Sequence, residues 1–143
     1  MADPGTLNLK HIVERTQKRM GWSDEQAAKI SFEYVRYLRI AQAYPKVSIV
    51  PSVLVDEIWH DHILHTKQYH SDCRAMFGDY MHHLPETDPL AGGVKPDIEE
   101  TLSLYARLFG ELPPSDVWEC CAGSKECQGS VCQACGRNCS KTP

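Results

Sequence analysis

The sequence of 143 residues lacks several features that would assign it to a common class of protein. It has no apolar run approaching the roughly 20 residues of a membrane span, so we expect no membrane partner. The formal net charge is −4, and this lack of basic excess argues against a nucleic-acid partner. The N-terminus has no apolar segment typical of secretory signals. We therefore expect a cytoplasmic protein whose seven cysteines are reduced or bind metal.

Alternating strand patterns are also scarce, whereas apolar residues recur at helical spacing. We predict an all-α fold, a compact bundle of about four helices followed by an irregular cysteine-rich tail. The predicted helices cover residues 7–20, 23–44, 53–77 and 96–109. The second begins with a capping box formed by Ser23 and Gln26. We assign residues 1–112 to the helical domain and residues 113–143 to the tail.

The third predicted helix, from Val53 to Phe77, is the longest and begins a histidine-rich stretch. Six of the seven histidines lie between residues 55 and 85. A step of about 100° per residue separates them onto different faces. The face predicted to enter the core contains Val55, Trp59, His62, Thr66, Tyr69, Cys73 and Phe77. The opposite face, predicted to be in solvent, contains Asp61, His65, Gln68 and Asp72. A buried His62 would bond either to a backbone carbonyl or to a tyrosine.

Asp56 and His60 are the best pair for a divalent metal ion, because residues four apart stack one turn above the other. His83 could supply a third ligand, since Gly78 lets the chain turn back over the helix. Three protein ligands and a water form an open zinc site, and similar nitrogen and oxygen donors bind iron or manganese. Zinc is the favoured ion. The alternatives are an Asp–His proton relay and a hydrogen bond that only orients the helix.

The residues of this stretch also resemble a known family. The pattern is Asp56-x-x-Trp59-His60-x-His62-Ile63, followed by Tyr69, Cys73, Gly78 and His83-x-Pro85. A later segment adds Leu104-Tyr105, Phe109-Gly110-Glu111, Pro113-Pro114 and Trp118. Together they resemble the glycine-rich domain-containing protein-like family, in particular its short bacterial members. The resemblance implies that Asp56, Trp59, His60, His62, Tyr69 and His83 form one shared feature. Trp59, His62 and Tyr69 would then lie behind the metal ligands.

Six cysteines lie within the tail, at positions 120, 121, 127, 132, 135 and 139. The Cys-x2-Cys step of Cys132 and Cys135 is typical of zinc sites, and Cys127 and Cys139 would complete a four-thiolate site. Three disulfides are an alternative, and a free tail or a cluster site is another. The tail could also contact a protein partner.

These observations leave two hypotheses for function. In the first, which we favour, the protein is a small metal-binding helical module for binding or interaction. In the second, it is a metal-dependent enzyme of hydrolase or oxidoreductase type, with the ion bound by Asp56, His60 and His83. No catalytic signature decides between them. An open coordination position beside a pocket would favour the enzyme.

Overall fold

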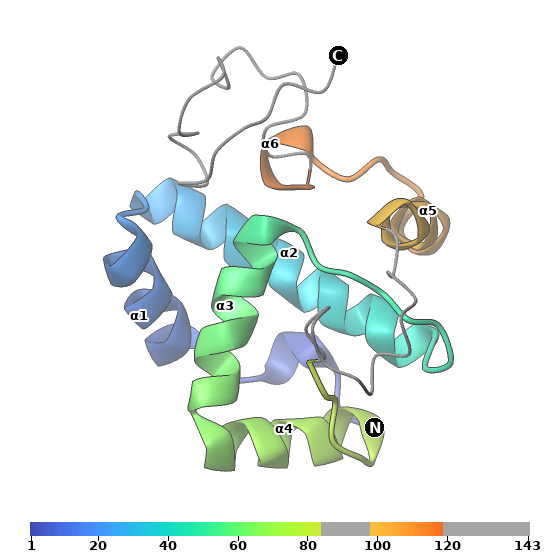
Figure 1. The fold of residues 1–143 in the computed structure, drawn as a ribbon, viewed down its shortest axis with the longest axis horizontal. Helices are drawn as coiled ribbons and strands as arrows, with labels where there is room; N and C mark the ends of the chain where they lie inside the picture. The colour runs from blue at the N-terminus through green and yellow to red at the C-terminus, as the bar shows by residue number, and fades with distance from the viewer. Residues whose placement is uncertain (84–97, 119–143) are drawn as a thin grey trace.

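The computed structural model describes residues 1–83 and 98–118, and every regular element within them is helical (Figure 1). The elements are η1 (Pro4–Thr6), α1 (Lys10–Met20), α2 (Asp24–Ala43), α3 (Val53–Leu64), α4 (Thr66–Phe77), α5 (Ile98–Phe109) and α6 (Ser115–Trp118). The predicted all-α fold is confirmed, although α6 was not among the expected helices. None of the helices in the described ranges is long and apolar enough to cross a membrane.

Helix α2 lies at the centre of the fold and contacts η1, α1, α3, α5 and α6. It begins with the predicted capping box. The Ser23 hydroxyl accepts a hydrogen bond from the backbone N–H of Gln26, and the Gln26 side-chain oxygen accepts one from the backbone N–H of Ser23. Its apolar stripe buries Tyr34, Tyr37 and Leu38 completely. A helix of 20 residues with this stripe can anchor the shorter helices around it.

The predicted single helix over residues 53–77 is wrong, because the chain breaks at His65. This residue has φ −82° and ψ 66°, and α4 turns sharply across the end of α3 (Figure 1). The His65 ring Nδ1 lies 2.7 Å from the carbonyl oxygen of Asp61, so it donates a hydrogen bond there. The backbone N–H of His65 shares the same carbonyl. Helix α2, rather than the third predicted helix, is the longest.

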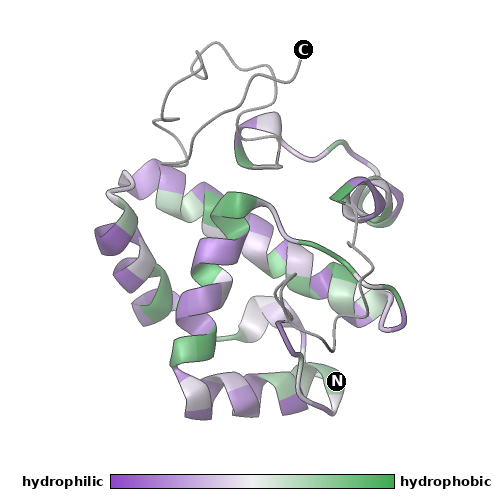
Figure 2. Ribbon diagram, viewed as in Figure 1, coloured by the Kyte–Doolittle hydropathy of each residue, from purple (hydrophilic) through white to green (hydrophobic). Residues whose placement is uncertain are grey.

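The core face of this stretch was mostly predicted correctly, whereas the solvent face was not. Helix α3 is hydrophobic at both ends and hydrophilic in its middle turns (Figure 2). The predicted core residues that are buried are Val55, Trp59, His62, Tyr69 and Cys73, whereas Thr66 is exposed and Phe77 half-buried. On the predicted solvent face, Asp61 is buried, and His65, Gln68 and Asp72 are half-buried.

Asp61 is buried because α1 packs on the side of α3 that was expected to meet solvent. Its carboxylate accepts hydrogen bonds from the Thr16 hydroxyl at 2.7 Å and from Arg19 at 2.9 Å. Arg15 lies 3.4 Å away. Burial raises the pKa of Asp61, but these hydrogen bonds and positive charges lower it overall. The carboxylate therefore stays ionised and joins α1 to α3.

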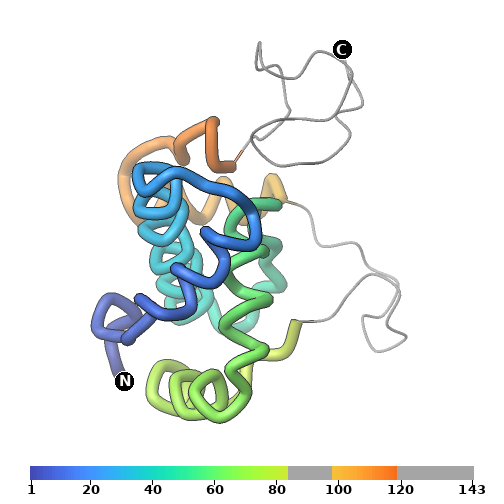
Figure 3. Tube along the Cα trace, turned by 90° about the vertical axis from the view of Figure 1, so that its left-hand side faces the viewer, coloured from blue at the N-terminus to red at the C-terminus, as the bar shows by residue number. Residues whose placement is uncertain are grey.

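The N-terminal segment runs beside α4 and supports it (Figure 3). The backbone N–H of Ala2 donates to the carbonyl of Ala75 at 2.8 Å, and the Gln42 amide bonds the carbonyls of Ala2 and Met76. Gly78, with φ +74°, then ends α4 in the left-handed conformation that favours glycine. Residues 79–83 continue from this turn back to α3, which brings His83 to the middle of that helix.

Candidate metal centre

Asp56, His60 and His83 meet at one point on the surface of α3. The His83 Nε2 lies 2.8 Å from Asp56 Oδ1, and the His60 Nε2 lies 3.1 Å from Asp56 Oδ2. The two Nε2 atoms are 3.0 Å apart. Among the described residues, this is the group of His, Cys, Asp and Glu side chains whose donor atoms lie close enough together to hold a metal ion. The structure thus brings together the three residues proposed from the sequence.

The three side chains differ in their contact with solvent. Asp56 and His60 lie one turn apart on α3, which begins at Ser52, whose hydroxyl accepts the N–H of Val55. The Asp56 side chain is 16% exposed, and His83 and His60 are 25% and 45% exposed. The carboxylate therefore lies at the inner side of the cluster, and the two imidazoles form its outer side.

His83 is held in place from behind by Trp59 and Tyr69. The rings of Trp59 and His83 are stacked, with centroids 4.3 Å apart and planes 5° apart. Trp59 Nε1 donates to the Tyr69 hydroxyl at 3.0 Å, and that hydroxyl donates to the carbonyl of Met81, two residues before His83. Burial raises the pKa of Tyr69, so the phenol keeps the proton that this second bond needs.

His62 points to the opposite side of α3 and belongs to the core. The Tyr34 hydroxyl lies 2.7 Å from its Nδ1, and Asp72 lies 2.8 Å from its Nε2. The Asp72 carboxylate accepts a hydrogen bond from the Nε2–H of His62, so the unprotonated Nδ1 accepts a hydrogen bond from the Tyr34 hydroxyl. Burial lowers the pKa of His62, although Asp72 acts in the opposite direction. Of the two partners considered for His62, the structure has the tyrosine, and His62 joins α2, α3 and α4.

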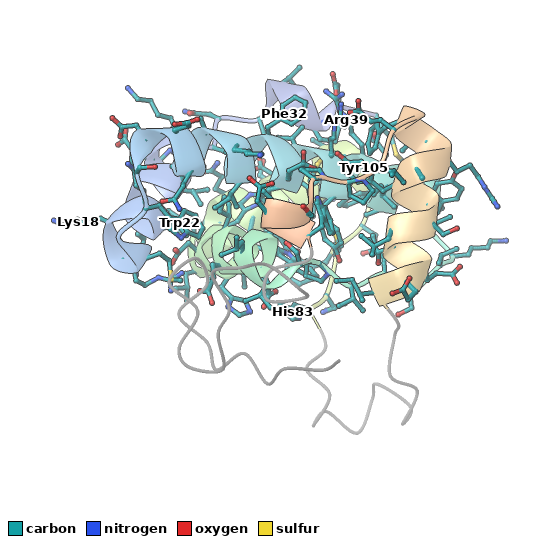
Figure 4. The ribbon with its side chains drawn as sticks, turned by 90° about the horizontal axis from the view of Figure 1, so that it is seen from above. Lys18, Trp22, Phe32, Arg39, His83 and Tyr105 are labelled. Atoms are coloured by element: carbon teal, nitrogen blue, oxygen red, sulfur yellow. The ribbon has the colours of Figure 1, made fainter. Side chains whose placement is uncertain are left out.

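A pocket of about 360 Å³ opens beside the cluster. It is lined by His60, Ile63, Tyr80, His82 and His83. Both imidazoles of the cluster therefore border the pocket. Figure 4 shows His83 at the edge of the described helices, on the side opposite Phe32 and Arg39. A ligand bound in this pocket would contact the side chains of both His60 and His83.

A second polar cluster, centred on Glu33, was missed in the sequence. The Glu33 carboxylate is buried and accepts hydrogen bonds from the Tyr105 hydroxyl at 2.8 Å and from Trp118 Nε1 at 2.9 Å. Arg36 donates to the same hydroxyl at 2.7 Å and pairs with Glu111. Burial and Glu33 raise the pKa of Tyr105 to about 12, against the effect of Arg36. The available signal was the position of Glu33 within the apolar stripe of α2.

Of the predictions made for cysteines, only the one for Cys73 concerns a residue that the structure describes. Cys73 is buried in α4, as expected, and burial raises the pKa of its thiol, so it is an unreactive core residue. The proposed tail site of Cys127, Cys132, Cys135 and Cys139, with Cys120 and Cys121 as alternates, lies outside the described residues.

Comparison with known families corrects the resemblance inferred from the sequence. The model of the UCP032817-like family matches residues 7–92, more than half of the chain, and the chain belongs to this family. The assignment to the glycine-rich domain-containing protein-like family is therefore wrong. It depended on a few spaced residues between Pro51 and Trp118, whereas the matching model covers a continuous stretch that includes α1 and α2. No curated protein and no solved structure matches the chain.

Proposed function

We propose that the protein binds one divalent metal ion through Asp56, His60 and His83. The short contacts among the three side chains carry this proposal: one carboxylate oxygen of Asp56 lies 2.8 Å from His83 Nε2, the other lies 3.1 Å from His60 Nε2, and the two Nε2 atoms are 3.0 Å apart. With one donor atom taken from each residue, all three lie within 4.8 Å of one another. At a metal–ligand distance of about 2.1 Å, neighbouring ligands lie about 3.0 Å apart at 90° and about 3.4 Å apart in a tetrahedron. The cluster therefore needs little rearrangement to bind an ion.

The contact between the two imidazoles also supports an ion. Two Nε2 lone pairs repel each other unless a proton or a metal ion lies between them. If the cluster served only to orient α3, a hydrogen bond from His60 would be enough for the Asp56 carboxylate. Here the stacked ring of Trp59 also holds His83 against that carboxylate. With the ring protons on Nδ1, both Nε2 atoms are free to coordinate the ion.

Three protein ligands leave coordination positions for water or for a substrate, and a pocket lined by both imidazoles lies beside the cluster. This observation favours the second hypothesis, a metal-dependent enzyme of hydrolase or oxidoreductase type, over a closed binding module. Zinc fits two imidazoles and one carboxylate, and iron and manganese use the same donors in open sites. A bound ion would polarise a ligand or lower the pKa of a bound water.

The metal content of protein purified without a histidine tag tests the proposal. Wild-type protein should contain an ion that His60→Ala lacks, whereas His70→Ala, which removes an exposed imidazole from α4, should keep it. Because the tail has its own thiols, the difference between the variants is the informative quantity. Equal metal content in all three proteins, or no metal after incubation with zinc, iron and manganese, would refute the site.

We further propose that Cys127, Cys132, Cys135 and Cys139 bind a structural zinc ion in a reducing compartment such as the cytoplasm. The argument is compositional. A short polar segment cannot fold by burial alone, and six thiols within twenty residues can supply the missing link through a metal. A tail folded around zinc could then contact a protein partner.

A further inference from the structure

The pocket beside Asp56, His60 and His83 has a composition that selects a particular kind of ligand. Among the described residues, its lining has three imidazoles, one phenol and the apolar side chain of Ile63, and no carboxylate. The ring of His82 lies 4.7 Å from that of Tyr80, so the two aromatic side chains form one wall.

We infer that this pocket binds a small organic carboxylate, whose carboxylate group coordinates the ion and whose apolar body lies against Ile63 and Tyr80. The inference rests on the proposed metal site, since the ion supplies the main attraction. A divalent ion with one carboxylate and two neutral imidazoles has a net charge of +1. Asp56 does not line the pocket, so the surface that the described residues offer to a ligand is positive and contains no competing carboxylate.

The size of the pocket limits the ligand. A volume of about 360 Å³ is at the lower end of the range found for small-molecule sites. Ile63 is half-buried and packs against the core, so its side chain is fixed and presents a rigid apolar surface. A ligand with a single ring or a short branched chain has enough apolar area to cover Ile63 and one face of Tyr80. A phosphate or other fully hydrated anion would leave this surface uncovered.

The experiment uses the full chain loaded with Co²⁺, whose visible absorption reports changes in coordination, and titrates it with benzoate. Benzamide serves as the neutral analogue of the same size. Benzoate should shift the Co²⁺ bands with saturation, and benzamide should cause no shift at the same concentrations. Ile63→Ser should weaken benzoate binding by about fivefold to tenfold through loss of apolar contact. Leu64→Ser, which removes a neighbouring side chain that is 62% exposed, should leave it unchanged.

The outcomes separate this inference from the metal proposal. If the protein binds Co²⁺ in a manner that requires His60 but benzoate shifts no band, the pocket assignment is wrong and the metal site stands. Equal shifts with benzoate and benzamide would show that the carboxylate is not recognised. Equal weakening by Ile63→Ser and Leu64→Ser would exclude Ile63 as the contact surface. Absence of His60-dependent Co²⁺ binding would overturn the metal site and the carboxylate site together.

Discussion

Tyr69→Phe is the substitution that tests most directly how the metal centre is supported. It removes one oxygen atom and keeps the ring, which packs edge-on against His62 and Tyr80. The lost oxygen accepts the N–H of Trp59 and donates to the carbonyl of Met81. The variant therefore releases the segment that carries His83 without opening a large cavity in the core.

The expected magnitudes follow from these two hydrogen bonds. Tyr69 is fully buried, its hydrogen bond with Trp59 is buried and its hydrogen bond with Met81 is partly buried, so the Trp59 N–H and the Met81 carbonyl each lose a partner where access of water is restricted. A buried polar group left without a partner costs about 1–3 kcal/mol, so the free energy of unfolding should fall by roughly 2–4 kcal/mol. Residues that orient metal ligands typically change affinity by about 10-fold to 100-fold, and we expect a loss in that range.

Two measurements are needed. Urea denaturation of the metal-free protein gives the change in unfolding free energy, and competition with a chromophoric chelator gives the affinity for zinc. Tyr44→Phe, which removes a phenol oxygen outside this network, is the matched control and should change neither quantity appreciably. Unchanged zinc affinity in a destabilised Tyr69→Phe variant would show that Tyr69 supports the core but not His83, which would refute the positioning argument.

Three further predictions concern the other polar clusters and the tail. Asp61→Asn should lower the unfolding free energy by about 2–3 kcal/mol at neutral pH, because it weakens a buried, charge-assisted network. Since the folded state lowers the pKa of Asp61, this stabilisation is present above about pH 4 and is lost at lower pH, so wild type and variant should converge there in acid denaturation. Glu33→Gln should cost about 1–2 kcal/mol in thermal or urea unfolding and leave zinc affinity unchanged, because an amide oxygen cannot serve both Tyr105 and Trp118 as well as a carboxylate does. In the tail, thiol counting on denatured protein without reductant should find six or seven free thiols together with released zinc, whereas one free thiol and no zinc would indicate three disulfides.

The candidate ligands could be proposed from the sequence because their geometry is local. Asp56 and His60 are four residues apart, so any helix through them places both side chains on one side. Gly78 gave a physical reason for the chain to reverse, and this reversal placed His83 within reach. The same reasoning correctly separated His60 from His62, because two steps of about 100° put them on nearly opposite sides of α3.

The errors concern properties that depend on distant parts of the chain. Considered on an isolated helix, Asp61 is predicted to lie on the surface. In the structure α1 packs over it, and Thr16 and Arg19 of α1 donate hydrogen bonds to its carboxylate. The sequence around Glu33 likewise indicates only a charged residue within a long helix. Its partners Tyr105 and Trp118 are more than 70 residues away along the chain. Helical periodicity predicts which residues share a face, but it does not predict which other helix will cover that face.

The break at His65 was the most consequential feature that the sequence did not reveal, because it builds the support of the metal centre. Trp59 and Tyr69 are ten residues apart, as are His62 and Asp72. In a straight helix each pair would be separated by about 15 Å along the axis, beyond the reach of any side chain. In the structure both pairs are hydrogen-bonded, at 3.0 Å and 2.8 Å, because α4 turns back across the end of α3 (Figure 1). A continuous helix over residues 53–77 would retain Asp56 and His60 on one face, but it would remove the contacts that hold Trp59 behind His83.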